Sequence, residues 1–205
     1  MSVQENVITM QGSAQMIAEY LRFAMNNLLF QRGVYPPNDF TPIEKYGIPI
    51  YMSQNHGVVE FFDKVLQKAE EWTSKKMVKS VIFVIHNVST KEIIERWDFQ
   101  LKYEEGNPSE DGTSQAVSYK PLPKIQAEIR DVMRQITSTI SFLPVLEQTC
   151  AFDVYIERDG GDLPEKWEEM PEGNVVISNS QTVKMRGFST GIHELGTFVT
   201  YKLMP

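Results

Sequence analysis

The sequence predicts a single α+β domain built from three helices and a sheet. Three segments carry apolar residues at helical spacing, and several others carry the alternation or the short apolar runs of strands. This patterning continues almost to the end of the 205 residues, of which 41% are hydrophobic and 23% charged, as is typical of a globular domain. A chain of this length buries roughly 70% of its unfolded surface, so it needs neither disulfides nor a metal ion to fold.

The three helices are predicted from their apolar spacing and their end residues. We expect the first to begin at Ser13, a common N-cap residue type, and to end at Gly33, which can adopt the left-handed conformation of a C-terminal cap. The second covers about residues 58–72, and its broad apolar face should pack on the sheet. The third covers about residues 124–141, with a single apolar stripe made of Ile125, Ile129, Val132, Met133, Ile136 and Ile140.

The first strands follow from shorter patterns. Residues 46–52 look extended, but Pro49 cannot donate a ladder hydrogen bond and restricts them to an edge or a broken strand. The run 81–85 is apolar without alternation, as in a central strand covered on both faces. Turn-forming residues in 86–92 then lead to clear alternation over 97–103, which predicts a hairpin with a half-exposed second strand.

The C-terminal part of the chain has one clear strand and several weak ones. Residues 149–157 alternate, with an apolar side that carries Cys150, Phe152, Val154 and Ile156. Beyond them, strand-like pieces near 175–177, 182–186 and 198–203 are short and interrupted. Such a segment is expected either when a strand has more than one workable register or when a C-terminus is simply rich in loops, and the pattern leaves both interpretations open.

Residues 104–118 have no periodic apolar pattern and contain glycine, proline and acidic residues, which predicts a mobile loop. This loop is not expected to separate two domains, because neither half of the chain has a complete set of core elements. We therefore treat residues 1–205 as one domain.

Charge and cysteine content exclude several classes of protein. A net charge of −7 argues against a nonspecific grip on nucleic acid or on an anionic membrane. The first ten residues have no basic start or continuous apolar stretch, and no run approaches the roughly 20 apolar residues of a membrane span, so a soluble protein that is not exported is expected. Cys150 is the single cysteine, which suits a reducing compartment.

Catalysis has little support in the residue pattern. Cys150 with His56, His86 or His193 permits a Cys-His pair, but its place on the apolar side of a strand favours a packed thiol. His86 at a strand end and His193 in a polar turn are ordinary placements. The spacings of metal ligands and of a phosphate-binding glycine loop are missing, so no cofactor, metal or catalytic residue is predicted. A small enzyme that uses Cys150 stays open as an alternative.

The third helix carries an unusual polar face. Arg130, Arg134, Thr137 and Ser141 align along it, and Arg134 points almost directly away from the apolar stripe. Exposed arginine on a rigid helix is good interface material, although a solvated helix face is the more common explanation.

The chain also resembles a known family. The matching segments run in order along nearly all of it: Gly12-Ser13-Ala14, Gln31 to Pro36, Lys45-Tyr46-Gly47, Glu95-Arg96-Trp97, Arg134 to Thr137, Phe142-Leu143-Pro144, Pro164 to Glu169, and Tyr201-Lys202. Together they resemble the HORMA-domain proteins of the spindle assembly checkpoint, the mitotic-arrest-deficient-two branch. HORMA adaptors of DNA repair or of the meiotic chromosome axis fit less well, and they are the alternative.

The resemblance implies a fold and a mechanism. It implies a mostly antiparallel central sheet with three helices, a core of about residues 12–157 and a mobile C-terminal safety belt of about 158–205. The belt switches between open and closed forms and closes over a peptide of a kinetochore receptor or of the anaphase-promoting-complex co-activator, which delays anaphase. A comet-type antagonist and an AAA+ remodelling ATPase are the other implied partners, in the nucleus, at the kinetochore and in the cytoplasm.

The resemblance also assigns roles to single residues. Phe152, Val154 and Ile156 lie in the strand on which the peptide would add, and Trp167 and Tyr201 lie in the belt. The implied interface between an open and a closed copy is formed by Arg130, Arg134, Gln135, Thr137, Ser141 and Phe142. Gly160-Gly161 and Pro49 depart from the family pattern and bear on the balance between the two forms.

Overall fold

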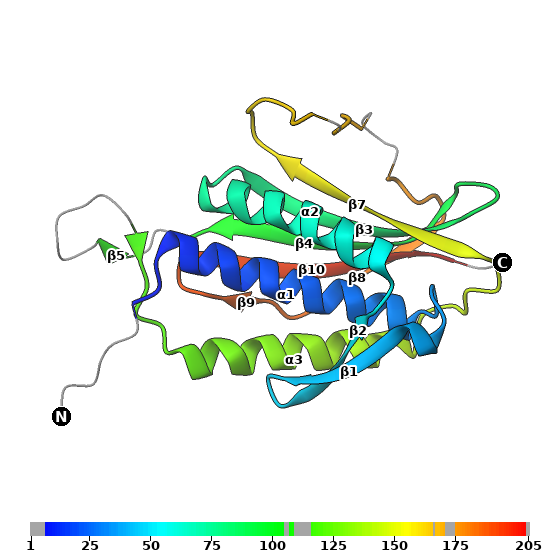
Figure 1. Cartoon of the computed structure of the whole chain (residues 1–205), viewed down its shortest axis with the longest axis horizontal. Coiled ribbons are helices and arrows are strands. Elements are labelled where there is room, and N and C mark those ends of the chain that lie inside the picture. The colour runs from blue at the N-terminus through cyan, green and yellow to red at the C-terminus, as the bar shows by residue number, and fades with distance from the viewer. Residues whose placement is uncertain (1–6, 105–106, 109–115, 166, 171–174, 204–205) are drawn as a thin grey trace.

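The computed structural model describes residues 7–104, 107–108, 116–165, 167–170 and 175–203. Three α-helices are present in these residues, which confirms the predicted number: α1 (Met10–Gln31), α2 (His56–Ser74) and α3 (Leu122–Ile140), with a 3₁₀ turn at Pro37–Asp39. Figure 1 shows α1 between α2 and α3, in front of the sheet. All six residues of the predicted stripe on α3 are buried, so the helical period identified its inner face correctly.

The main sheet has six strands and is antiparallel throughout its described pairs. The order across it is β7 (Cys150–Arg158), β3 (Val78–Asn87), β4 (Ile93–Tyr103), β10 (His193–Lys202) and β8 (Ser180–Lys184), and β9 (Phe188–Ser189) also pairs with β10. The last three strands in the sequence, β8, β9 and β10, therefore lie on the opposite side of β4 from β7. Two short strands, β5 (Asn107–Pro108) and β6 (Ala116–Val117), pair with each other outside this sheet.

The core lies between the helices and the sheet face that they cover. Alternate residues of the central strands, Phe83 of β3 and Trp97 and Phe99 of β4, are fully buried there. Tyr20 of α1 contacts the edges of both Phe99 and Phe188. The helix α1 contributes the largest number of fully buried side chains because it has neighbours on three sides: Ile17, Tyr20, Leu21, Met25, Leu28 and Leu29.

The predicted start of α1 is wrong. The helix begins three residues before Ser13, and Thr9 caps it by accepting a hydrogen bond from the backbone N–H of Gly12 at 3.1 Å. Ser13 is fully buried inside the helix and bonds to Thr190 and His193. These two residues belong to the segment from β8 to β10, residues 180–202, which we call the C-terminal hairpin. The end was predicted correctly, since Gly33 has φ = 63° and follows the C-cap Arg32.

The extended segment around Pro49 forms a separate hairpin. β2 (Ile48–Ser53) pairs with β1 (Phe40–Lys45), which the sequence did not predict. The two strands form a sheet of their own, so Pro49 sits in an edge strand as expected. The turn uses left-handed residues at Tyr46 (φ = 55°) and Gly47 (φ = 73°), the arrangement that suits a two-residue hairpin loop.

The central hairpin was predicted well, with one difference. β3 is covered on both faces over residues 81–85 and β4 follows it, as expected. The polar side of β4 is less exposed than the alternation suggested, because Asp98 is buried and Arg96 is half-buried. Glu95 is buried as well, on the face of the helices.

The C-terminal quarter is more regular than its pattern suggested. Residues 198–203 were predicted as a short piece, but residues 198–202 are the second half of β10, a strand of 10 residues in the interior of the sheet. The piece predicted near 182–186 corresponds to β8, whereas residues 175–177 form no strand. Most of the predicted loop 104–118 lies outside the described residues, and its described ends form β5 and β6.

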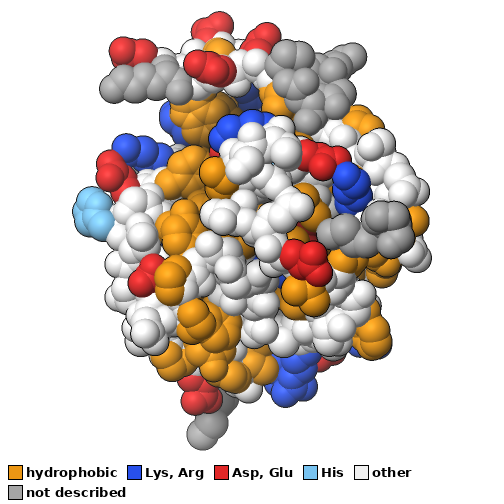
Figure 2. All heavy atoms as spheres, turned by 90° about the vertical axis from the view of Figure 1, so that its right-hand side faces the viewer, with side chains coloured by type: hydrophobic (Ala, Val, Ile, Leu, Met, Phe, Trp, Pro, Cys, Tyr) orange, Lys and Arg blue, Asp and Glu red, His pale blue; other side chains and the backbone are white. Residues whose placement is uncertain are grey.

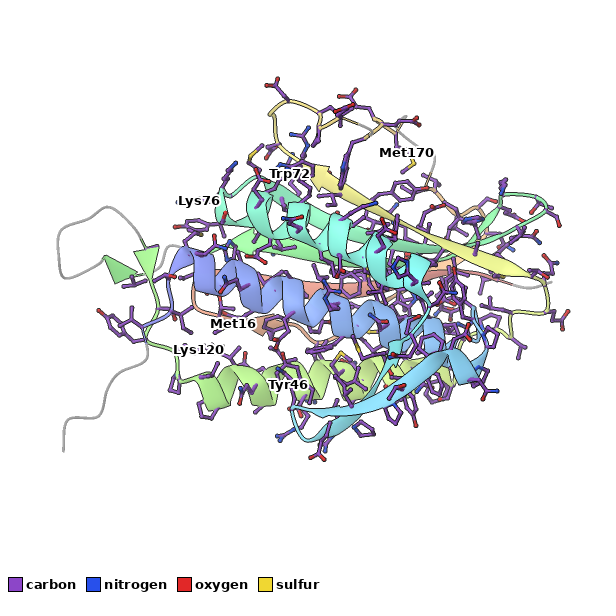
Figure 3. All side chains as sticks on the ribbon, in the orientation of Figure 1. Met16, Tyr46, Trp72, Lys76, Lys120 and Met170 are labelled. Atoms are coloured by element: carbon purple, nitrogen blue, oxygen red, sulfur yellow. The ribbon has the colours of Figure 1, made fainter. Side chains whose placement is uncertain are left out.

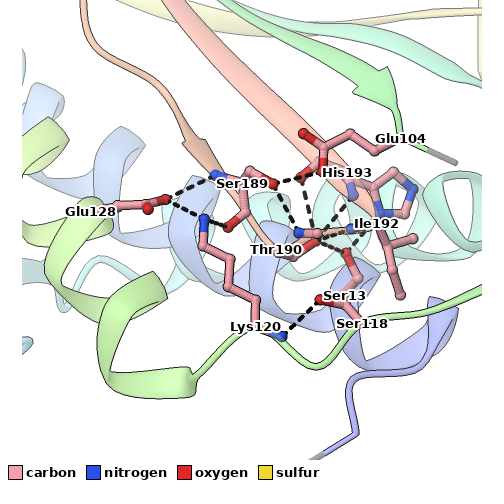
Figure 4. Close-up of polar contacts among 10 residues, drawn as sticks. Ser13, Glu104, Ser118, Lys120, Glu128, Ser189, Thr190, Ile192 and His193 are labelled. Carbon is pink, nitrogen blue, oxygen red and sulfur yellow. Dashed lines mark hydrogen bonds and ion pairs between the residues drawn. The ribbon is translucent and has the colours of Figure 1, made fainter. Parts of the chain in front are cut away.

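The turn that precedes β10 is anchored to the start of α1, as Figure 4 shows. The Ser13 hydroxyl lies 2.6 Å from Thr190 Oγ1 and 2.7 Å from His193 Nδ1. Thr190 Oγ1 also accepts from the backbone N–H of His193 at 3.0 Å. The prediction that His193 lies in a polar turn is therefore wrong. His193 is the first residue of β10, and its buried side chain contacts Ser13, 180 positions earlier in the chain.

A second set of contacts holds Ser189, the residue before Thr190. The Lys120 ammonium donates to Ser189 O and to Glu128 Oε2, both at 2.7 Å, and Ser189 N donates to the same carboxylate at 3.2 Å. Gly191 packs so closely on Ser118 that an added Cβ would lie 2.1 Å from its hydroxyl oxygen. The hairpin is thus fixed to α1 and α3 by polar contacts as well as by its strand pairs.

His193 makes stability depend on pH. Burial lowers the pKa of its imidazole from an ordinary value of 6.5 to about 4, the Thr73 backbone opposes this shift, and the nearby Lys76 charge adds to it. Its Nε2 is buried without a well-formed hydrogen bond, and the Tyr103 ring packs beside it. The neutral ring is therefore the form that the folded state holds.

We predict that unfolding free energy falls as the pH drops below 6.5 and that this contribution is complete near pH 4. Only the unfolded chain binds a proton on this imidazole in that window, so the loss reaches up to about 3 kcal/mol. Urea unfolding of wild type and His193→Gln, compared at several pH values, measures it as a difference. His56→Gln, at a side chain 95% exposed, is the control. Parallel pH profiles for wild type and His193→Gln would refute the prediction.

Candidate functional site

Both edge strands of the main sheet, β7 and β8, are unpaired on their outer sides among the described residues, and β7 is the longer of the two. β7 pairs with β3 along its whole length, and no other described strand pairs with its outer side. Alternate backbone N–H and C=O groups of an edge strand point outward, so this side can hydrogen-bond to another extended chain. The strand prediction for 149–157 is confirmed by β7, and its free edge is the first component of the site.

The chain turns back over β7 immediately after this strand (Figure 1). We call the described residues between β7 and β8, namely 159–165, 167–170 and 175–179, the crossing segment. It begins with Asp159 N donating to Met77 O at 2.8 Å, followed by Gly160 (φ = 61°) and Gly161 (φ = 80°). A Cβ on Gly161 would come within 2.6 Å of the Met77 methyl carbon, so both conformation and space favour glycine here.

An aromatic contact holds the first part of the crossing segment. The Trp167 ring meets the edge of Trp72 on α2, with centroids 5.3 Å apart and planes at 70°. The Arg158 guanidinium carbon lies 4.6 Å from the Trp72 ring centroid. The contact between Trp167 and Trp72 therefore holds the first part of the crossing segment on α2.

A cleft of about 630 Å³ lies between β7 and the crossing segment. Trp72 and Met170, both labelled in Figure 3, line it from the helix and from the segment opposite. The lining combines apolar and polar surface in nearly equal amounts: Ile82, Val154, Tyr155, Ile156, Leu163, Trp167 and Val175 together with Arg96, Glu157, Arg158, Glu168 and Glu169. Such a mixture suits a ligand that is apolar along its length and charged at particular points.

The exposed charged side chains that line the cleft are acidic. Glu157, Glu168 and Glu169 are exposed and line the cleft. The two arginines of the lining are engaged inward, since Arg158 lies over Trp72 and Arg96 pairs with Asp98 at 2.6 Å. A basic group on a ligand would therefore meet favourable charge at this margin.

The predicted peptide-binding residues occupy different positions. Val154 and Ile156 line the cleft, and so does Trp167. Phe152 lies further in, stacked on Phe83 at 5.6 Å. Tyr201 is on β10, where its hydroxyl donates to Gln181 at 3.0 Å, and it is not among the described residues that line the cleft.

The residues predicted to form a dimer interface lie on or just after α3. Arg134 is exposed, as the helical period predicts, whereas Arg130 is half-buried. Thr137 Oγ1 accepts from Asn27 Nδ2 at 3.2 Å, and Gln135 Oε1 accepts from the Arg186 backbone at 2.7 Å. These two residues therefore also help to hold α3 against α1 and the C-terminal hairpin.

The end of this helix is markedly apolar on its surface. Ser141 forms the C-cap, and Phe142 immediately after it is 83% exposed. Val145 nearby is also exposed. Figure 2 looks at this end of the molecule, where hydrophobic side chains lie in several patches among few charged ones. An exposed phenylalanine at the end of a helix that also carries an exposed arginine is typical of surfaces that bind other proteins.

The environment of Cys150 does not favour a reactive thiol. It is half-buried at the start of β7, and its Sγ contacts Gln148 O at 3.3 Å. Burial raises the pKa of this thiol, although the Arg32 charge partly opposes the shift. His86 is engaged with Asp153 at 3.0 Å. Among the described residues there is no group of three potential metal ligands, and none of their helices is long and apolar enough to cross a membrane.

Sequence reasoning missed the residues that shape the crossing segment. Arg96 and Asp98 read as the solvated side of a strand, and Gly161 read as a departure from a family pattern. Arg96 Nη1 donates to Val175 O at 3.2 Å, a contact between residues 79 positions apart. In the sequence, an aspartate two residues after an arginine on one face of a predicted strand is too common a pattern to identify a site by itself.

Comparisons with known proteins match the chain over nearly its whole length. The HORMA domain family model matches residues 13–193. The human mitotic spindle assembly checkpoint protein MAD2A is 39% identical over 202 residues, which cover 98% of this chain and 95% of that protein. A chain in a crystal structure of the mitotic checkpoint complex matches with a TM-score of 0.81 and 29% identity, over 94% of this chain and 100% of that one.

A more distant structure shares the fold. Caenorhabditis elegans HTP-1, solved bound to the HIM-3 closure motif, matches with a TM-score of 0.77 over 97% of this chain and 94% of that one. It is 15% identical, so its likeness concerns the fold alone.

We predict that Cys150 reacts slowly with iodoacetamide in the native protein at neutral pH, several-fold slower than in the urea-unfolded chain. Its raised pKa leaves less thiolate, and its partial burial limits access. A Cys150→Ser, Ser138→Cys variant places the thiol on the exposed side of α3 and serves as the fast-reacting control. Native Cys150 reacting as fast as the unfolded chain would restore the hypothesis of a thiol enzyme.

Proposed function

This chain belongs to the HORMA-domain family, in its mitotic spindle checkpoint branch, and on that premise we propose that it delays anaphase by clasping a short peptide of a partner. The peptide is a motif of the kinetochore checkpoint receptor or of the anaphase-promoting-complex co-activator. The role is that of a non-enzymatic adaptor, which the protected environment of Cys150 supports. Identity to checkpoint proteins over nearly the whole chain favours this function over a repair or meiotic adaptor.

The observation that carries the proposal is the unpaired outer edge of β7 beneath the crossing segment. A peptide that adds there as a further strand gains main-chain hydrogen bonds, and these do not depend on its sequence. The side chains that alternate toward the cleft then supply specificity. Two of the proposed binding residues, Val154 and Ile156, line the cleft, whereas Phe152, on the same face of β7, packs in the core against Phe83.

The crossing segment and the C-terminal hairpin act together as a safety belt. In this proposal residues 158–205 form the belt on a core of about residues 12–157, and the belt moves between an open and a closed form. The position of β8 and β10 on the far side of β4, with the crossing segment over β7, supports the closed arrangement. Trp167 secures the belt on α2, and Tyr201 contributes indirectly by holding β10 beside β8.

The cleft margin supports a particular peptide chemistry. Glu157, Glu168 and Glu169 favour a basic residue, and the apolar lining favours alternating apolar residues. A proline suits the end of the motif, because strand addition stops where a backbone N–H is missing.

A second surface supports self-association. We propose that Arg130, Arg134, Gln135, Thr137, Ser141 and Phe142 form the interface between an open and a closed copy. The exposure of Arg134 and Phe142 supports it, and the contacts of Gln135 and Thr137 suggest that these two orient α3. The same surface would bind a comet-type antagonist, and an AAA+ ATPase would reset the belt. A checkpoint role of this kind places the protein in the nucleus, at kinetochores and in the cytoplasm.

We predict micromolar or tighter binding to short peptides that carry a basic residue, alternating apolar residues and a proline, taken from the two checkpoint partners. Fluorescence anisotropy with labelled peptides measures it. Trp167→Ala should weaken binding about tenfold or more, because a buried tryptophan contact at an interface is lost. Phe142→Ala, on the proposed dimer surface, should leave binding unchanged. If the protein binds the peptide of neither checkpoint partner, the checkpoint proposal is wrong.

We predict that Arg134→Glu abolishes self-association and leaves peptide binding intact, since its side chain points away from the core. Sedimentation velocity at several concentrations measures the first effect, and peptide anisotropy measures the second. Lys64→Glu, which makes the same kind of charge change on the exposed side of α2, is the control. An unchanged dimer would place the interface elsewhere, and loss of folding would show that the helix face was assigned incorrectly.

A further inference from the structure

Arg96 projects from β4 on the sheet face that the helices do not cover. Its neighbours in sequence, Glu95 and Trp97, point to the helix side, where Trp97 is fully buried. Arg96 shares the opposite face with Asp98, two residues further along the strand. This is the face over which the crossing segment passes on its way from β7 to β8.

Asp98 fixes the guanidinium of Arg96 in one orientation. Arg96 Nε donates to Oδ2 of Asp98 at 2.9 Å, and Nη2 donates to Oδ1 at 2.6 Å. The two parallel bonds form a fork, and the Asp98 side chain is only 10% exposed. The third nitrogen, Nη1, is therefore aimed in a set direction.

That nitrogen contacts the crossing segment. Arg96 Nη1 donates to the carbonyl oxygen of Val175 at 3.2 Å. Beyond Val175 the chain becomes buried at Ile177, whose carbonyl accepts from Ser180 Oγ at 2.9 Å, and β8 begins at Ser180. The Arg96 contact thus lies between the cleft and the C-terminal hairpin.

We propose that Arg96, oriented by Asp98, fastens the crossing segment to the sheet and so sets how long a peptide stays in the cleft. The proposal rests on the peptide-clasp function and adds a positioning residue that touches the belt backbone instead of the peptide. Trp167 holds the near part of the crossing segment and Arg96 its far part, with the cleft between them. A peptide cannot leave sideways until one of these two contacts opens.

The contact requires an arginine. A lysine ammonium at the same position has one nitrogen and no planar fork, so it cannot bond both Asp98 oxygens and the Val175 carbonyl in this geometry. An asparagine in place of Asp98 keeps the size of the side chain but presents one amide N–H₂ group to the guanidinium, which removes its fixed orientation. The two substitutions therefore test the same contact from its two ends.

The experiment measures peptide release. Labelled peptide is bound to wild type, Arg96→Lys and Asp98→Asn, an excess of unlabelled peptide is added, and the dissociation rate is followed by anisotropy. Both variants should release the peptide about tenfold faster, the effect of losing one charge-assisted hydrogen bond. Amide hydrogen exchange of residues 175–179 should rise in both variants even without peptide.

Arg22→Lys is the matched control. Arg22 also pairs with an aspartate, Asp63 at 2.7 Å, but on the surface between α1 and α2, away from the crossing segment. Its release rate should equal that of wild type. The proposal is overturned if folded Arg96→Lys or Asp98→Asn releases peptide at the wild-type rate and residues 175–179 exchange as in wild type. If Arg96→Lys does not fold, the result for Asp98→Asn decides whether the proposal holds.

The exchange measurement separates this proposal from the proposed function. Wild type that binds no checkpoint peptide contradicts the clasp, whereas the exchange of residues 175–179 in the free protein still decides whether Arg96 fastens the segment. Peptide binding with unchanged release and exchange contradicts the fastening alone.

Discussion

A buried ion pair at the centre of the molecule determines how its parts fit together. Arg32, at the end of α1, donates to Glu95 of β4 at 2.9 Å, and the two side chains are only 6% and 1% exposed. Arg32 also donates to Pro144 O at 2.6 Å, and Trp97 Nε1 donates to Glu95 at 2.5 Å. Burial raises the pKa of Glu95, and the Arg32 charge and the Trp97 hydrogen bond oppose the shift. Breaking such a pair from one side typically costs about 3–5 kcal/mol, which makes this junction between helix, sheet and the approach to β7 hard to alter.

The N-terminal end of α1 is bonded to the C-terminal hairpin and not to β4. Ser13 bonds to Thr190 and His193, so a single helix connects the ion pair at one end with the C-terminal hairpin at the other. β7, in contrast, is held by β3 on one side only. The interior of the molecule is therefore strongly cross-linked, and the site that we propose for peptide binding lies at an edge of the sheet.

How much the sequence revealed depended on the range of the interaction. The stripe on α3 and the run 81–85 were identified because burial of one face leaves a local apolar period. β10 was underestimated because its inward positions include Thr197, fully buried but polar, while Phe198 points the other way. The bonds of Ser13 to His193 and of Arg96 to Val175 join residues 180 and 79 positions apart, and nothing local marks such partners.

The course of the crossing segment gives the site a topological property. Its two ends continue into β7 and β8, which belong to the same hydrogen-bonded sheet, so strand pairing closes a loop of chain over the cleft. A motif with folded domains on both sides cannot pass under such a loop by sliding. Entry from the side then requires the loop to be undone at its weaker end, where β8 contributes only five residues to the sheet. Assembly and release should accordingly be limited by strand separation rather than by diffusion, and a tight complex need not have a fast association step.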